Sequence, residues 1–154
     1  MNNQLFDITG ATLLSIEEAS EYLTYKERKY DFWWWLRSPG DDSDCAANVD
    51  TSGSISDYGN LVSYGNVYVR PALQIKNLKS TNLLVGDTFR IIEYEFKVIS
   101  NDLAWMYDSH IGQYPFNKNS EGGNDYNTSD IKWYVDKWFN AFIKPYYPYW
   151  IQEL

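Results

Sequence analysis

The order of apolar and polar residues divides the chain into two halves joined by a polar segment, residues 76–82. At the start of the first half, residues 12–14 form an apolar run that predicts a short strand. Ser15 follows, with Glu18 three residues later, and this spacing is the capping box that begins a helix. The apolar spacing that follows predicts a helix to about residue 23, with its acidic side chains toward solvent.

A run of aromatic residues over 31–38 favours a strand that ends at the following Pro-Gly pair. Because side chains alternate along a strand, Trp33 and Trp35 are expected on one face and Trp34 on the other. We expect five tryptophans to be buried in the core: Trp33, Trp35, Trp105, Trp133 and Trp138.

Residues 41–66 are rich in Asp, Ser, Asn, Gly and Tyr, which predicts short strands joined by tight turns. Residues 67–75 then predict a closing strand, in which Pro71 indicates an edge position or a bulge. In the second half, three further strands are predicted at 89–92, 96–99 and 103–106, with a hairpin turn between the last two.

Residues 107–128 are predicted to be a loop, and a helix follows from about 128 to 143, ended by Pro145. The aromatic segment 145–151 is expected to pack on the domain or on a partner. The apolar stripe of this helix has helical spacing and comprises Ile131, Tyr134, Val135, Trp138, Ala141 and Phe142.

The composition narrows the function classes. The chain has 154 residues, enough for a single domain with its own core, and 18% of them are aromatic. Its net charge of −8 argues against direct nucleic-acid binding but is compatible with a basic partner. One cysteine, Cys45, and one histidine, His110, are too few for a disulfide framework or a Cys/His zinc site.

The chain has no long uncharged apolar run, and its first residues lack the basic and apolar regions of a signal peptide. We therefore expect a cytoplasmic protein with no membrane span.

Several spaced motifs resemble a domain family of unknown function that is common in gut Firmicutes and their phages. That family is related to the C-type-lectin-like fold of the formylglycine-generating enzymes. The resemblance implies an α+β scaffold with short antiparallel strands and two main helices. The motifs that carry it are Trp34-Trp35-Leu36-Arg37-Ser38-Pro39-Gly40, Cys45-Ala46-Ala47-Asn48-Val49, Ser52-Gly53-Ser54-Ile55 and Val69-Arg70-Pro71-Ala72-Leu73.

The two halves stand in the opposite order from the resembling family, in which the Trp-Leu-Arg-Ser-Pro-Gly half closes the domain. The interpretation is one domain of residues 1–154 that is circularly permuted, with a signature half (1–75), a junction (76–82) and a second half (83–154). The alternative is a swapped homodimer in which a second chain completes each half.

The signature residues are interpreted as structural, with the two arginines holding strands and loops together through buried hydrogen bonds. These residues are Trp34, Trp35, Arg37, Ser38, Arg70 and Pro71. Cys45 is expected to be a small buried hydrophobe, because the chemistry of the formylglycine-generating enzymes depends on two cysteines.

No catalytic residue, metal site or cofactor is predicted. The aspartates of residues 41–57 could supply oxygen ligands to calcium, but their spacing matches no EF-hand, and a solvated acidic loop is favoured. Asp108, Ser109 and His110 are residue types of a hydrolase triad, yet adjacent residues cannot readily adopt its geometry.

The positive functional feature is a surface rich in Tyr, Ser and Asn between residues 41 and 68, of the kind that antibody paratopes use. The same residue types also suit tight turns, so both interpretations remain open. The candidate ligand- or partner-binding residues are Asp57, Tyr58, Asn60, Tyr64, Asn66 and Tyr68.

The function expected from these features is that of a non-catalytic binding protein that recognises a protein or a small polar ligand. The main alternative is an acidic phage or mobile-element inhibitor that covers a basic surface of a host defence protein. Two further alternatives are sequestration of a signalling nucleotide, which needs a cationic phosphate site, and an enzyme with paired carboxylates in a deep pocket.

Overall fold

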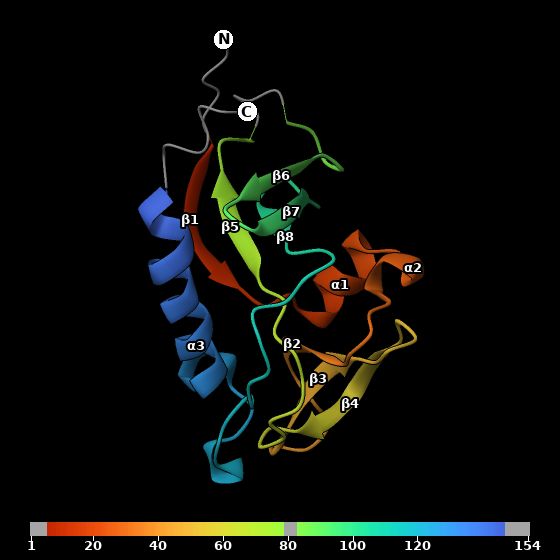
Figure 1. Ribbon diagram of the computed structural model, residues 1–154. Helices are drawn as coiled ribbons and strands as arrows, with labels where there is room; N and C mark the ends of the chain where they lie inside the picture. Colours follow the sequence, from red (N-terminus) through yellow and green to blue (C-terminus); the bar gives the residue numbers. More distant parts are fainter. Residues whose placement is uncertain (1–5, 79–82, 147–154) are drawn as a thin grey trace.

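Two antiparallel sheets and three α-helices make up the computed structural model, which describes residues 6–78 and 83–146 (Figure 1). The expected α+β fold is confirmed. The five-stranded sheet runs in the order β1 (Asp7–Thr12), β5 (Ala72–Lys76), β8 (Leu103–Trp105), β7 (Tyr94–Val98) and β6 (Thr88–Ile91). The three-stranded sheet runs in the order β2 (Trp34–Pro39), β3 (Cys45–Val49) and β4 (Ile55–Leu61).

The helices flank these sheets on two sides. In Figure 1, α3 (Asp130–Trp138) lies along β1, whereas α1 (Ile16–Tyr22) and α2 (Tyr25–Arg28) lie on the other side. A π-helical turn over Phe139–Ile143 continues α3, and 3-10 turns occupy Ser120–Gly122, Tyr126–Thr128 and Lys144–Tyr146. No helix within residues 6–78 and 83–146 has the length and apolar character needed to cross a membrane.

The predicted capping box at the start of α1 is confirmed. The Ser15 hydroxyl accepts from the amide of Glu18, and the Glu18 carboxylate accepts from the amide of Ser15. The strand predicted at 12–14 is wrong in position, because β1 ends at Thr12. The carbonyls of Leu13 and Leu14 accept hydrogen bonds from Arg37 instead of from a neighbouring strand of the sheet.

The aromatic strand differs from its prediction at Trp33. Strand β2 begins at Trp34, three residues after the predicted start, and its two faces meet two separate hydrophobic clusters. Trp34 and Trp35 are therefore both buried, on opposite faces, whereas Trp33 is 42% exposed. The expectation that Trp33 belongs to the core is wrong, because it precedes the strand that would have turned it inward.

The closing strand is shorter and more central than predicted. Strand β5 begins at Ala72 and lies between β1 and β8, so it is not an edge strand. Pro71 stands just before it, where its missing N–H interrupts no ladder, and its carbonyl accepts from the Met106 amide. The preceding segment forms isolated bridges instead of a strand, with Tyr68 paired to Trp34 on one side and to Gln113 on the other.

The three strands predicted in the second half are confirmed as β6, β7 and β8, and the β7–β8 pair is the predicted hairpin. Pairing of β5 with β8 joins the two halves of the chain in one sheet. Part of the proposed junction, residues 79–82, and most of the aromatic segment 145–151 lie outside the described residues, so the predictions for them stay predictions.

The apolar stripe of the last helix changes phase at its end. The π-helical turn adds a residue to the repeat, so Phe139 and Ile143 are buried, whereas Phe142 is 48% exposed and Ala141 is also exposed. The expected burial of Trp133 is wrong too, because its side chain is 55% exposed on the outer face of α3. Burial of Trp105 and Trp138 is confirmed.

Candidate functional site

An open cleft of about 440 Å³ lies where the segment before β2 meets β4 and the loop after it. Three of its lining residues are aromatic and exposed: Phe32 at 41%, Trp33 at 42% and Tyr64 at 49%. The remaining lining residues are polar except for one valine, namely Asp31, Thr51, Asn60, Asn66 and Val67. The cleft thus combines wide ring surfaces with amide, hydroxyl and carboxylate groups.

The β3–β4 turn holds Thr51 at the rim of this cleft. The Asp50 carboxylate accepts from the Ser52 hydroxyl at 2.6 Å and from the backbone amides of Ser52 and Ser54 at 2.9 and 3.1 Å. These hydrogen bonds, led by that from the Ser52 hydroxyl, lower the pKa of Asp50. The turn also needs Gly53, whose φ is +92° and whose added Cβ would lie 2.5 Å from the Tyr25 carbonyl oxygen.

Tyr68 and His110 support the wall of the cleft from behind. The Phe32 ring stacks on Tyr68 with centroids 4.2 Å apart, and Tyr68 contacts the His110 ring at 4.5 Å. The Tyr68 hydroxyl accepts from the Gln113 amide at 2.7 Å, and its backbone amide donates to the Trp33 carbonyl at 2.8 Å. Phe32 is therefore held in place although its outer side faces solvent.

The six candidate binding residues are divided between two places. Asn60, Tyr64 and Asn66 line the cleft together. Asp57 and Tyr58 lie on β4 outside the cleft, and the Tyr58 side chain is 71% exposed. Tyr68 is only partly exposed and acts as a support for Phe32 rather than as an open surface.

Sequence reasoning missed the aromatic half of the cleft. The strand predicted over 31–38 includes Phe32 and Trp33 and expects Trp33 in the core, whereas Asp31 and Thr51 have no predicted binding role. A signal was present in the run of one Phe and three Trp, because one strand with two faces rarely buries four large rings in succession.

Arg37 links the start of α1 to the end of β2. Its guanidinium donates to the Leu13 carbonyl at 2.6 Å and to both carboxylate oxygens of Glu18 at 2.6 and 3.2 Å. The next residue, Ser38, accepts from the Ile16 amide at 2.9 Å. Arg37 and Ser38 therefore act within the framework, and neither lines the cleft.

Arg70 lies deep in the structure and is 2% exposed. Its guanidinium carbon is 4.0 Å from the ring centroid of Tyr30, 4.3 Å from that of Trp105 and 4.9 Å from that of Trp34. Its Nε donates to the Ser109 carbonyl at 2.9 Å. Desolvation lowers the pKa of Arg70 to about 10.

The acidic loop brings Asp42, Asp44 and Cys45 together, with one potential ligand atom from each within 4.8 Å of the others. Cys45 is half-buried rather than buried as expected, because it begins β3 just after the exposed residues 41–43, and its thiol contacts the Asp44 carboxylate. Partial desolvation and the neighbouring aspartates raise the pKa of Cys45, so its thiolate is disfavoured. Calcium prefers six to eight oxygen ligands, and this cluster offers two carboxylates and a thiol.

Ser109 and His110 do not form a nucleophile and base. The Ser109 hydroxyl donates to the His110 backbone carbonyl at 3.5 Å, not to its imidazole. The imidazole packs instead against Tyr30, Phe32 and Tyr68. Desolvation and the charge of Arg70 lower the pKa of His110, so its neutral form is favoured.

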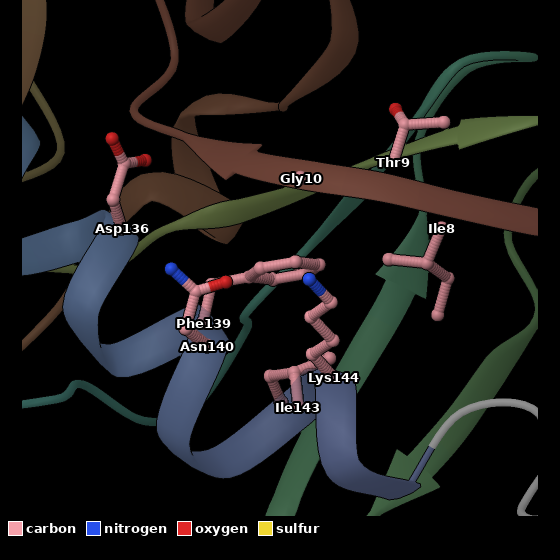
Figure 2. Close-up of a pocket in the computed structure, with 8 residues that line it drawn as sticks. All are labelled: Ile8, Thr9, Gly10, Asp136, Phe139, Asn140, Ile143 and Lys144. Atoms are coloured by element: carbon pink, nitrogen blue, oxygen red, sulfur yellow. The ribbon is translucent and has the colours of Figure 1, made fainter.

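Two further hollows lie along β1. One of about 440 Å³ is drawn in Figure 2, where Ile8 is on the same side of the strand as Phe139 and Ile143, and Thr9 is on the other side. A neighbouring hollow of about 670 Å³ contains Glu18, Arg37, Lys132 and Asp136. These four residues are already joined as two ion pairs, so the hollow presents fewer free charges than its composition suggests.

Comparison with known proteins gives one match. Comparison with curated proteins and with solved structures found nothing similar. Residues 5–77, which contain β1 to β5 together with α1 and α2, match the family model described as a domain of unknown function (DUF6273). The first half of this chain is thus similar to a domain whose activity is not described, and the cleft lined by Phe32, Trp33 and Tyr64 lies within that half.

Proposed function

We propose that the protein is a non-catalytic binding protein that holds a small polar ligand in the cleft lined by Phe32, Trp33 and Tyr64. The observation that carries the proposal is the gathering of Phe32, Trp33 and Tyr64, all at least 41% exposed, around one hollow with polar side chains. Large exposed rings are unusual on a free surface and are enriched at recognition sites.

The cleft best suits an uncharged ligand that has both an apolar face and a hydroxylated edge, such as an oligosaccharide. A ring can stack against the apolar C–H face of a sugar, while Asn60 and Asn66 can both donate to and accept from its hydroxyls. The described lining includes one carboxylate, that of Asp31, which offers a further acceptor but has no second carboxylate beside it in the lining. This composition supports binding rather than catalysis.

The decisive experiment is an oligosaccharide array probed with the wild-type protein and with the double variant Trp33→Ala/Tyr64→Ala. Covering the exposed part of the Trp33 ring would bury about 100 Å², worth about 2.5 kcal/mol at 25 cal/mol per Å². Each ring is therefore expected to contribute at least about tenfold to the affinity. Both side chains are exposed, so the double variant should unfold at the same urea concentration as the wild type.

The matched control is Trp133→Ala, which removes an equally large exposed ring from α3. It should bind the array as the wild type does. Absence of binding to every oligosaccharide would overturn the proposal, as would equal binding by the double variant, or loss of binding in the Trp133→Ala control.

We also propose that the scaffold is a permuted member of the C-type-lectin-like class. Its support is the combination of short antiparallel strands, two sheets and few helices, together with the motif order described above. Binding through loops on such a scaffold needs no catalytic group, and this agrees with the composition of the cleft.

A second candidate function is inhibition of a basic protein surface through β4. This strand is the edge of its sheet, with Asp57 and Tyr58 exposed on it, and the Asp41 amide is bonded to the Tyr58 carbonyl. The protein has a net charge of −8, so its affinity for a basic partner should fall about tenfold when the salt concentration rises from about 0.05 to about 0.5 M. Retained affinity at high salt, or in Asp57→Asn/Tyr58→Ala, would contradict it.

A further inference from the structure

A second pocket, of about 410 Å³, lies between α2 and the five-stranded sheet, with Arg70 and Trp105 among its lining residues. It collects four cationic side chains in a protein whose net charge is −8: Lys26, Lys29, Arg70 and Lys97. Two acidic residues, Glu27 and Asp108, also line it. The sequence shows no such basic patch, because these four cations come from three separate segments of the chain.

Arg70 has an unusual environment for a buried cation. It is 2% exposed, and none of the ion pairs within the described residues includes it. Its Nε is bonded to the Ser109 carbonyl, but its buried Nη1 has no hydrogen-bond partner. The three surrounding rings stabilise the charge, yet they supply no lone pairs for the N–H groups of the guanidinium.

A second donor beside it is also without an acceptor. The indole Nε1 of Trp105 is buried and has no hydrogen-bond partner in the described structure. The guanidinium of Arg70 is over the Trp105 ring at 4.3 Å, so the two unused donors belong to neighbouring groups. Burying a donor without a partner costs about 1–3 kcal/mol, and more for a charged group, so an acceptor is expected here.

The cations at the rim differ in their availability. Lys97 forms an ion pair with Glu27, which neutralises both. Lys26 and Lys29 are exposed and have no ion-pair partner among the described residues. With Arg70 they leave three positive charges facing the single carboxylate of Asp108, an excess that attracts an anion.

We propose that this pocket is a binding site for a small oxyanion-bearing ligand, whose carboxylate or phosphate group is held by Arg70 with the help of Lys26 and Lys29. An oxyanion supplies the lone pairs that the guanidinium and the indole lack, and a guanidinium binds both groups through paired hydrogen bonds. The site is separate from the cleft lined by Phe32, Trp33 and Tyr64, and the proposal does not depend on the function proposed for that cleft.

The experiment is a titration of the ¹⁵N-labelled protein at constant ionic strength, followed through the NMR signals of the Trp105 indole N–H and the Arg70 Nε–H. One series uses inorganic phosphate and another sodium acetate, each exchanged against sodium chloride. A saturable shift with phosphate or acetate supports the proposal, and the series that saturates at lower concentration identifies the preferred oxyanion. Chloride-like, non-saturating behaviour in both series would overturn it.

Variants at the rim separate binding from folding. Lys26→Ala/Lys29→Ala removes two exposed lysines and should raise the dissociation constant about fivefold to tenfold. The control Lys118→Ala/Lys137→Ala removes the same charge from exposed positions outside the pocket and should leave the constant unchanged. Equal effects of the two pairs would overturn the proposal, because they would indicate a general charge effect. Arg70→Lys, where it folds, should abolish saturation at millimolar phosphate.

Discussion

Glu18 is the side chain on which the contact between α1 and β2 depends, so Glu18→Ala is the sharpest test of the framework. One of its oxygens accepts from the Ser15 amide at 2.9 Å, and both oxygens contact the Arg37 guanidinium. Losing the capping bond costs about 1 kcal/mol. Losing the two-point ion pair, whose side chains are 32% and 24% exposed, costs about 1 kcal/mol after allowance for solvent screening.

The total of about 2 kcal/mol should lower the midpoint of thermal unfolding by about 4–8 °C for a chain of this size. Glu18→Gln keeps an acceptor for the Ser15 amide but loses the charge, so it should show about half the effect. The assay is thermal and urea unfolding followed by circular dichroism, with Glu17→Ala as the matched control. Glu17 is exposed in the same helical turn, and its replacement should change stability by less than about 0.5 kcal/mol.

A double-mutant cycle with Arg37→Ala isolates the pair. The coupling free energy between Glu18 and Arg37 should be about 1 kcal/mol. Additive effects of the two substitutions, or a Glu18→Ala midpoint within 1 °C of that of the Glu17→Ala control, would refute the reasoning that the ion pair ties the helix to the strand.

Three further predictions concern the β3–β4 strand pair, the turn between these strands and the last helix. Gly59→Ala should lower the free energy of unfolding, measured in urea, by about 3 kcal/mol or more, because φ is +84° and the new Cβ would lie 2.1 Å from a backbone oxygen of β3. The control Gly65→Ala places its Cβ in open space and should change that free energy little. Asp50→Asn should reduce the loss of stability on acidification. Hydrogen bonds within the turn lower the pKa of Asp50, so its contribution to stability is complete above about pH 4 and is lost as the pH falls further. Urea unfolding at pH 5 and pH 3 should therefore show a smaller difference in the variant than in the wild type. Phe139→Ala should cost about 3 kcal/mol and Phe142→Ala less than about 1, and the reverse order by calorimetry would argue against the π-helical turn.

Features set by a few neighbouring residues could be predicted from the sequence. The capping box at Ser15 needs only one Glu three residues later, and the hairpin between β7 and β8 needs only its turn residues and alternating strands. Asn60, Tyr64 and Asn66 line one cleft for the same reason, since these candidate residues lie within a few positions of one another in the sequence.

The remaining features depend on contacts between distant segments. Burial of both Trp34 and Trp35 requires two hydrophobic clusters on opposite sides of β2, one of them built around Trp105 and the other around Phe116. The phase change after Trp138 comes from one π-helical turn, which an apolar stripe of ordinary helical spacing does not reveal. The cationic pocket around Arg70 likewise exists only after α2 has packed against the sheet.

The pairing of β5 with β8 has a consequence for how this chain can be divided. The segment that matches the known domain ends at residue 77, directly after β5, so its boundary runs through the middle of the five-stranded sheet. A fragment of residues 1–77 would expose the backbone edge of β5 that β8 covers and would tend to aggregate. Supplied with a fragment of residues 83–154, the same edge becomes a template, so the two pieces form a natural pair for split-protein complementation. The segment of sequence similarity therefore contains only part of the sheet to which it contributes.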